Sequence, residues 1–421
     1  MTPQFSGLDD SDDEDGYGNY VLHVRTALLE AKKGAITALG EMAAHTGAAF
    51  VPHLETSMNC LSKSAENWHP LIKSECADAF PSLVNPSVAA NHADGINWTK
   101  GDITGPNPLS PHTNAVVSAV LTQLLNLMSD DDVDTVGKAC EGIQGVIEQC
   151  GPHALLPIAE TCLKNVHELI SRQAPCQMAH EDDGEEDDDH EPYMTSVCDL
   201  IGAFARVMGA QFAPHLGTFL QPICNFAKSS RPPSDRAMAI GCLGEIAQEM
   251  GPSIAEFWPN VFLPAVLAGL ADEDENVKRN AAFCGGVCAE GLKETISAQY
   301  YPQLLQALSP LFGIDTNESD TSKACVDNAC AAVSRMIMAA PNDMPLAQVL
   351  PPVLRCLPLK NDMTENETVY NCLLGLISMN NADAVANKTD IRRVFMEAIA
   401  ETSKVDDEIK AKLSTALPGL A

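Results

Sequence analysis

A pattern that recurs about every 40 residues is the strongest constraint on what this chain can fold into. Glycines end predicted helices at regular intervals: 42 residues separate Gly209 from Gly251, and 40 residues separate Gly251 from Gly291. A helical segment with an early proline follows each joint, and an acidic or polar turn then precedes a second helical segment. The prolines are Pro157, Pro214, Pro259 and Pro302, and the turns are 130–132, 234–235, 272–274 and 319–320. The pattern predicts an all-α chain built from pairs of helices.

The stretch 272–291 shows what one second helix of the repeat contains. Ala281, Gly285 and Cys288 form a stripe of small residues along one helix face, which allows another helix to pack very close. Asn280 and Phe283 fall on a neighbouring face that is too polar for a dry core. Two helices per unit, a period near 40 residues and no strand signals are typical of a HEAT-repeat solenoid, an α-α superhelix. We expect about eight helix pairs, whose stacked second helices line a concave surface.

Composition agrees with closely packed helices and indicates the class of partner. Hydrophobic residues make up 45% of the chain and aromatic residues only 5%, which does not suit a β-sandwich. The formal net charge is −31, so the surface repels nucleic acid and anionic membranes and attracts basic proteins. None of the 15 cysteines stands in C-x-x-C spacing. Five of them are predicted to be small core residues in a reducing compartment: Cys242, Cys284, Cys288, Cys330 and Cys372.

Two acidic segments set the predicted domain organisation. Residues 1–20 are expected to be an acidic disordered lead-in, and 21–421 to be the solenoid. A loop at 181–191, in which nine of eleven residues are acidic, is expected to interrupt the solenoid. This loop either keeps the chain soluble or attracts a basic partner. His180 and His190 flank it, but they imply no ligand geometry, so no metal site is expected.

The common sequence motifs of phosphate-binding and catalytic sites are absent from the sequence. It contains no phosphate-cradling glycine loop, no G-x-S-x-G and no H-E-x-x-H. No apolar run approaches the roughly 20 residues that a membrane-spanning helix needs. We therefore expect a soluble intracellular binding protein, not an enzyme, with no cofactor and no bound metal.

The polar faces of the second helices carry the candidate binding residues. Amides can hold the backbone of an extended peptide, and carboxylates beside an aromatic ring suit a lysine ammonium. The alternative for each carboxylate is an ordinary solvated helix face, and for Asn280 and Asn328 it is a hydrogen bond between helices. The predicted peptide-binding residues are Glu245, Asn280, Phe283, Asp327, Asn328, Glu365, Asn366, Glu367 and Tyr370.

Four stretches of these helices resemble the importin beta (karyopherin beta) family, in particular the carboxyl-terminal half of its importin-4 class. They are L-G-E at 243–245, V-K-R-N-A-A-F at 277–283, V-D-N-A-C-A-A-V-S-R-M-I at 326–337 and L-P-L-K-N-D at 357–362. The acidic segments near the start and at 181–191 are also similar to that class. Phe283 stands where a tyrosine would offer a hydroxyl, and which acid among 365–367 points inward is left open.

The resemblance implies a nuclear import receptor that shuttles between cytoplasm and nucleus. Its implied cargoes are histones H3 and H4 and ribosomal proteins, gripped by their lysine-rich signals, and a histone chaperone is a further candidate partner. Nucleoporins are implied as well, and Ran-GTP through an amino-terminal arm that this chain would lack. Two alternatives stay open. One is a HEAT-repeat scaffold of a phosphatase or chromosome complex, and the other is a nuclear export receptor.

Overall fold

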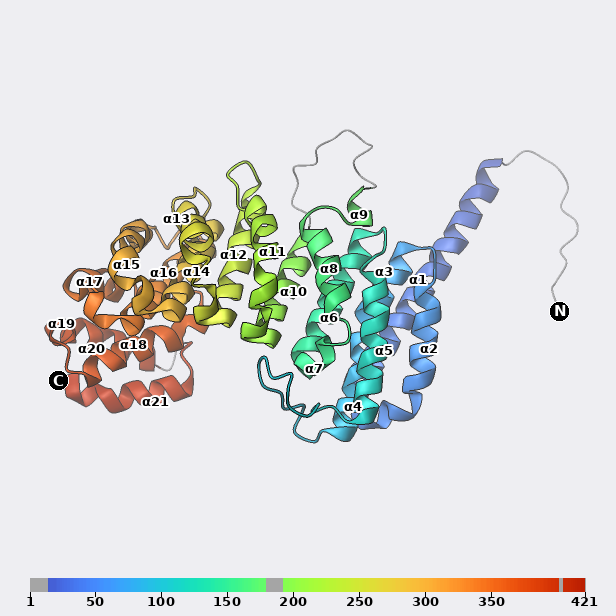
Figure 1. Cartoon of the computed structure of the whole chain (residues 1–421), viewed down its shortest axis with the longest axis horizontal. Coiled ribbons are helices and arrows are strands. Elements are labelled where there is room, and N and C mark those ends of the chain that lie inside the picture. The colour runs from blue at the N-terminus through green and yellow to red at the C-terminus, as the bar shows by residue number, and fades with distance from the viewer. Residues whose placement is uncertain (1–13, 179–191, 401–403, 421) are drawn as a thin grey trace, which may run out of the picture. The chain divides into compact units, whose positions relative to one another are not determined.

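The computed structural model describes residues 14–178, 192–400 and 404–420, with side chains from residue 26 onward. Helices connected by turns and loops make up these ranges, and no strand occurs in them (Figure 1). The prediction of an all-α chain is confirmed. The acidic insertion at 181–191, with His180 and His190, lies outside the described residues.

Twenty-one α-helices follow one another along the described residues. They are α1 (Glu14–Thr46), α2 (Leu54–Ala65), α3 (Pro70–Ala79), α4 (Val84–Asn91), α5 (Pro111–Leu127), α6 (Val133–Cys150), α7 (Pro152–Leu155), α8 (Ala159–Ile170), α9 (Pro175–Met178), α10 (Pro192–Met208), α11 (Ala213–Phe226), α12 (Pro233–Met250), α13 (Leu263–Leu270), α14 (Glu275–Leu292), α15 (Glu294–Leu308), α16 (Asp320–Ala339), α17 (Leu346–Cys356), α18 (Asn366–Ser378), α19 (Ala382–Ala386), α20 (Lys388–Ile399) and α21 (Asp407–Ala416). Short 3₁₀-helices and one π-helix (η6) lie between or after them: η1 (Gly47–His53), η2 (Pro81–Leu83), η4 (Gly209–Phe212), η5 (Gly251–Ile254), η6 (Trp258–Phe262), η7 (Ser309–Gly313), η8 (Pro341–Asp343), η9 (Met363–Glu365) and η10 (Leu417–Leu420).

Successive long helices of the described ranges form eight pairs after the unpaired first helix, which agrees with the predicted solenoid. The pairs are α2 with α3, α5 with α6, α8 with α10, α11 with α12, α13 with α14, α15 with α16, α17 with α18, and α20 with α21. Helix α1 begins at Glu14, so the end of the acidic lead-in expected over 1–20 is helical; residues 1–13 lie outside the described ranges.

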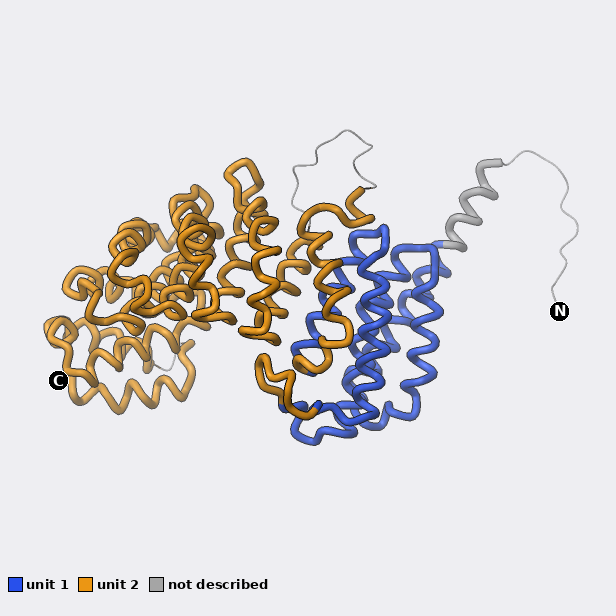
Figure 2. Tube along the Cα trace, in the orientation of Figure 1, with its two compact units in different colours: residues 1–97, 107–150 blue, residues 98–106, 151–421 orange. Residues whose placement is uncertain are grey.

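Contacts divide the chain into two compact units (Figure 2). Unit 1 comprises residues 1–97 and 107–150, and within it α1 packs on α3 and α3 on α6. Unit 2 comprises residues 98–106 and 151–421 and contains all nine predicted peptide-binding residues. A single array over 21–421 stays a prediction.

Unit 2 stacks its helices in two layers. Helices α10, α12, α14, α16 and α18 form the inner layer, and each packs against the next. The outer layer is formed by α8, α11, α13, α15 and α17, each beside its inner partner or a neighbouring outer element (Figure 1). Helix α16 is buried almost along its whole length, from Ala324 to Ile337. Such burial on every side explains why this helix consists mostly of small and apolar residues.

Polar turns start the inner helices, as the repeat pattern predicts. The carboxylate of Asp274 accepts hydrogen bonds from the backbone N–H groups of Asn276 and Val277, which caps α14. The hydroxyl of Ser319 accepts from the N–H of Ser322 at 2.9 Å and caps α16. Each cap satisfies donors that the first turn of a helix leaves free.

Glycines near the junctions between helices have two different structural roles. Gly209 and Gly251 both have a φ of 52°, a left-handed backbone that a residue with a Cβ rarely adopts. Gly291 was expected to end its helix, but it lies inside α14, and Lys293 with a φ of 48° ends the helix instead. A Cβ on Gly291 would lie 3.0 Å from the backbone of Gly251, so this glycine serves close approach and not chain reversal.

Further glycines make room for the side chains of the next inner helix. A Cβ on Gly202 of α10 would collide with the carboxylate of Glu245 on α12. A Cβ on Gly244 of α12 would lie 2.8 Å from the ring of Phe283 on α14. Helices α10 and α12 thus each carry a glycine against which a larger side chain of the next inner helix packs. The predicted stripe of small residues is what brings the helices this close.

We expect Gly286→Ala to lower the free energy of unfolding by about 1–3 kcal/mol, the usual cost of overpacking. The added Cβ would lie 2.8 Å from the Cα of Ala332, a backbone atom that cannot rotate away. Gly375→Ala in α18 is the control, because its Cβ would meet no atom within 4 Å. Removing the flexibility of a helical glycine should stabilise that variant by about 0.5–1 kcal/mol. Urea unfolding of both variants tests the opposite signs; equal shifts would contradict the packing described.

Candidate peptide-binding surface

Three predicted binding residues lie half-exposed on neighbouring inner helices: Glu245 on α12, and Asn280 and Phe283 on α14. The amide nitrogen of Asn280 donates a hydrogen bond to the carbonyl oxygen of Ala237 at 2.7 Å. Its amide oxygen accepts from Nε of Arg279 at 3.2 Å. Asn280 therefore makes the hydrogen bond between helices, here α14 and α12, that the sequence analysis gave as the alternative to peptide binding. Glu245 and Phe283 still reach solvent.

The aromatic and acidic groups around Phe283 already hold a cation of the same chain. The guanidinium carbon of Arg335, on α16, lies 5.7 Å from the centre of the Phe283 ring. Arg335 also contacts two carboxylates, Glu290 at 3.3 Å and Glu365 at 2.9 Å. Arg335 is only 7% exposed. From the sequence we expected an aromatic ring and carboxylates to bind a lysine of the cargo. In the structure Arg335 of the same chain occupies that position.

Asp327 and Asn328 are covered by the loop 357–362. The carboxylate of Asp327 accepts hydrogen bonds from three consecutive backbone N–H groups, those of Lys360, Asn361 and Asp362, at 2.7–3.1 Å. Burial raises the pKa of Asp327, although these N–H groups oppose the rise. Asn328 donates to the carboxylate of Asp362 at 2.8 Å. Both side chains anchor this loop on α16.

The cluster at the start of α18 is mostly buried too. Asn366 is 2% exposed and its amide oxygen has no hydrogen-bond partner. Tyr370 packs edge-on against Phe395, 6.5 Å between ring centres, and burial raises the pKa of its hydroxyl well above the usual range. Glu367 is exposed.

Burial corrects the predicted site. In this structure a peptide cannot reach five of the nine residues, because they lie in contacts between repeats: Asp327, Asn328, Glu365, Asn366 and Tyr370. For Glu245, Asn280, Phe283 and Glu367 a role in binding stays a prediction. Arg335 and Glu290 were not among the predicted residues, although Arg335 lies in the family-like stretch 326–337. The small and apolar residues on all faces of 324–337 were the available signal that α16 is covered on every side.

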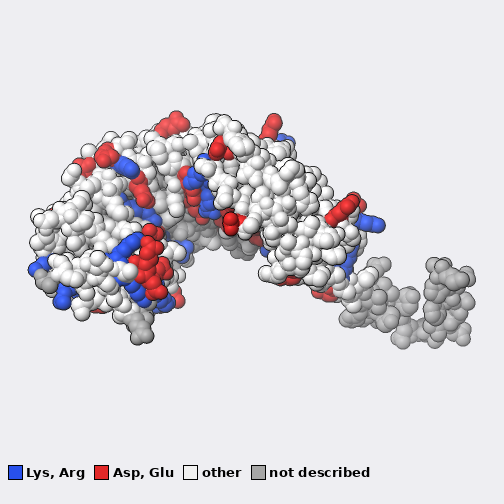
Figure 3. All heavy atoms as spheres, turned by 90° about the horizontal axis from the view of Figure 1, so that it is seen from below, with Lys and Arg blue, Asp and Glu red and all other residues white. Residues whose placement is uncertain are grey.

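Basic side chains accompany the acidic ones along the inner helices. Glu249 on α12 pairs with Arg206 at 3.2 Å and with Lys100. Arg236 binds Asp272 through two hydrogen bonds of 2.8 Å and holds the pKa of that carboxyl below its usual range. Figure 3 shows one face on which Asp and Glu adjoin Lys and Arg, with uncharged residues over most of the area. The predicted acidic trough is thus partly neutralised by the chain itself.

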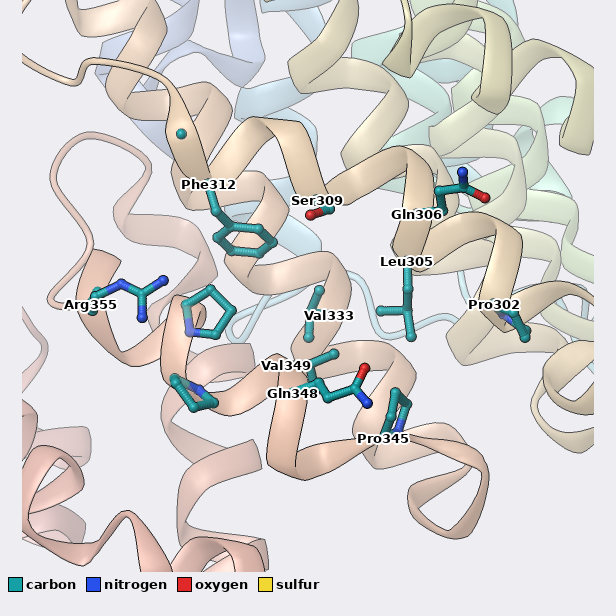
Figure 4. Close-up of a pocket in the computed structure, with 13 residues that line it drawn as sticks. Pro302, Leu305, Gln306, Ser309, Phe312, Val333, Pro345, Gln348, Val349 and Arg355 are labelled. Atoms are coloured by element: carbon teal, nitrogen blue, oxygen red, sulfur yellow. The ribbon is translucent and has the colours of Figure 1, made fainter.

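A groove of about 830 Å³ opens on the outer layer of unit 2 (Figure 4). It runs between α15 with η7 and the proline-containing helix α17, and Val333 of α16 lies at its base. Its walls are largely apolar, and Arg355 contributes a charge to the lining: Pro302, Leu305, Gln306, Ser309, Phe312, Gly313, Val333, Pro345, Gln348, Val349, Pro351, Pro352 and Arg355. The shape and chemistry suit an apolar side chain of a partner.

Neither a metal site nor a membrane span emerges from the described ranges. Over those residues no cluster of three or more His, Cys, Asp or Glu side chains could hold a metal ion. Likewise, none of the helices there combines the length and the apolar character needed to cross a bilayer.

Similarity to known proteins extends over nearly the whole chain. No family model matches it. "Probable importin subunit beta-4" of Schizosaccharomyces pombe is 26% identical over 413 residues, which cover 94% of this chain and 38% of that protein. "Importin-4" of Homo sapiens is 27% identical over 412 residues, which cover 94% of this chain and 36% of that protein. The chain therefore spans little more than a third of the length of these relatives.

Solved structures agree on the fold. Kap121p bound to Nup53p superposes with a TM-score of 0.70 at 16% identity, covering 94% of this chain and 34% of that one. Kap121p has also been solved bound to RanGTP, and that structure superposes with a TM-score of 0.65. The helix-pair array and the likeness along 94% of the chain agree with each other. This chain is similar to importins of the importin-4 class, and its helices are arranged as in the solved karyopherin Kap121p.

Proposed function

We propose that this chain is the cargo-binding part of a nuclear import receptor and binds lysine-rich segments of basic proteins. The observation that carries the proposal is the likeness to importins along 94% of the chain. The proposed cargoes are histones H3 and H4 and ribosomal proteins, with a histone chaperone as an additional partner. The receptor would shuttle between cytoplasm and nucleus and would work without a cofactor.

The proposed contact surface is the part of the inner layer where acidic and aromatic groups stay accessible. Glu245, Asn280 and Phe283 are half-exposed, and the side chain of Glu290 is 56% exposed. Exposed carboxylates attract an ammonium group by charge and accept its hydrogen bonds. The net charge of −31 would add a long-range attraction that speeds encounter with a basic cargo.

Ran-GTP and nucleoporins are the other proposed partners. Kap121p, whose fold this chain shares, has been solved with each of RanGTP and Nup53p. We assign Ran-GTP to parts of the receptor outside this chain. For nucleoporins we propose the groove between α15 and α17, since its apolar walls would bury an apolar side chain of such a partner.

Titration with a histone H3 tail peptide tests the proposed cargo site. We expect micromolar or tighter binding that weakens with salt, because exposed charges are screened. The double variant E245Q/E290Q keeps side-chain volume but removes two negative charges, and it should bind at least about tenfold more weakly, equivalent to about 1.4 kcal/mol. E256Q changes an exposed acid outside the inner layer and should leave affinity unchanged.

The outcome separates the proposal from its alternatives. Equal affinity of the wild type and E245Q/E290Q would refute the surface named above. A chain that binds no lysine-rich peptide at all would favour a scaffold of a phosphatase or chromosome complex. A complete receptor that holds cargo only together with Ran-GTP would be an export receptor.

A further inference from the structure

One segment of the long loop before α5 lies against the inner helices of unit 2. Residues 98–106, called here the crossing segment, belong to unit 2, although the chain on both sides of them belongs to unit 1. Near its start, the ring of Trp98 covers Gly151, where an added Cβ would collide with the ring. Near its end, Nε2 of His153 lies 3.1 Å from the carbonyl oxygen of Gly105. The crossing segment is therefore fixed near both ends.

The middle of the crossing segment brings a lysine to the ends of two inner helices. The ammonium of Lys100 donates hydrogen bonds to the carboxylate of Glu249 and, at 3.3 Å, to the backbone carbonyl oxygen of the same residue. The N–H of Gly101 donates to the carbonyl oxygen of Val207 at 2.9 Å. Val207 and Glu249 lie in the last turns of α10 and α12. Carbonyl groups there lack partners within their own helix, and the helix dipole favours a cation beside them.

Two glycines make room for this arrangement. A Cβ on Gly209 would lie 2.9 Å from Cγ of Lys100, so the aliphatic part of the lysine passes over a residue without a side chain. Gly101 has a φ of 69°, and a Cβ there would lie 2.7 Å from the carbonyl oxygen of Met208. A lysine followed by a glycine therefore fits both helix ends.

This lysine lies next to the surface proposed for cargo. Glu249 follows Glu245 by four residues on α12, so the two carboxylates share one helix face. The side chain of Lys100 is 42% exposed and that of Glu249 is 14% exposed, and an ion pair with one member in solvent is weak. Arg206 pairs with the same carboxylate at 3.2 Å. Glu249 thus keeps a cation when Lys100 leaves, which makes the exchange of one lysine for another easy.

We propose that Lys100 is an internal competitor of the cargo: it fills a lysine subsite at Glu249 and the last carbonyl groups of α10 and α12, and a lysine-rich segment displaces it. This regulation rests on the proposed function, since it acts on the same surface. A segment with an isolated lysine gains little, because it only exchanges one ammonium for another. A lysine-rich segment also reaches Glu245 and Glu290, and that additional contact drives the displacement.

Titration of the full chain with the histone H3 tail peptide compares the wild type with K100Q. We expect K100Q to bind the peptide about three- to fivefold more tightly, because a subsite that is open for only part of the time lowers the apparent affinity by that fraction. K164Q is the control for the lost positive charge. It changes a lysine of the outer helix α8 whose side chain is 71% exposed, and it should bind like the wild type.

Two further measurements place the competition at Glu249. In E249Q the charged acceptor of Lys100 is gone, so K100Q/E249Q should bind the peptide no more tightly than E249Q. In the wild type, hydrogen exchange over residues 98–104 should quicken when the peptide is added. Displacement breaks the hydrogen bond from the N–H of Gly101 to Val207 and exposes this amide to solvent.

The results distinguish failure of the competitor from failure of the cargo proposal. Equal binding by the wild type and K100Q would overturn the role of Lys100 and leave the cargo proposal standing. A peptide that binds neither chain would overturn both. A gain in K100Q that persists in the E249Q background, or exchange over 98–104 that the peptide leaves unchanged, would contradict the subsite.

Discussion

Replacing Arg335 with leucine is expected to lower the free energy of unfolding by about 3–5 kcal/mol, as when one member of a buried ion pair is removed. The substitution leaves the carboxylate of Glu365, whose side chain is 6% exposed, without its cation. It also removes the contacts that Arg335 makes with Phe283 and Glu290 on α14. Urea unfolding followed by circular dichroism measures the loss.

The double variant R335L/E365L separates the cost of an unpaired charge from the loss of packing. Removing both charges should recover most of the stability lost in R335L, because apolar residues of similar size replace a buried ion pair at little cost. K138A, which breaks an exposed pair with Glu141, should leave the unfolding midpoint almost unchanged. If R335L behaves like K138A, Arg335 does not support the stack of inner helices.

The second large effect is expected for Asp327→Ala, a loss of about 3 kcal/mol. Its carboxylate is 1% exposed and accepts from the N–H groups of residues 360, 361 and 362. Each donor left without a partner costs about 1–3 kcal/mol, and contact with water at the edge of the loop keeps the total near the low end. Hydrogen exchange of these three amides should quicken in the variant. Unchanged exchange would show that Asp327 does not hold the loop.

The pH dependence of stability follows from the same carboxyl. Burial raises the pKa of Asp327 in the folded chain above its ordinary value of 3.8. The folded state therefore holds this proton more tightly than the unfolded state. The resulting stabilisation is complete below pH 3.8 and is lost as pH rises through the folded pKa. D327N lacks this titration, so the stability of the wild type relative to D327N should fall as pH rises through that window. A relative stability that rises there would mean that the N–H groups outweigh burial.

Much of the architecture could be predicted because it is repeated locally. The polar turns that start α14 and α16 carry their caps in their own sequence, at Asp274 and Ser319. Ala281 and Cys288, two members of the small stripe, are both fully buried. The site was harder to predict. Helical periodicity correctly placed Asn280 and Phe283 on one face, but it cannot say which distant residue meets that face.

The sequence by itself determined the period, the helix pairs and the stripe of small residues, since each depends on neighbours within about one or two helical turns. Only the tertiary structure decided which polar faces stay open. The loop 357–362 returns more than thirty residues after Asp327 to cover α16, and Arg335 crosses to Phe283 on the preceding inner helix. Those contacts depend on how loops close and how helices stack. A helical wheel drawn from residues 272–291 or 320–339 holds no information about either.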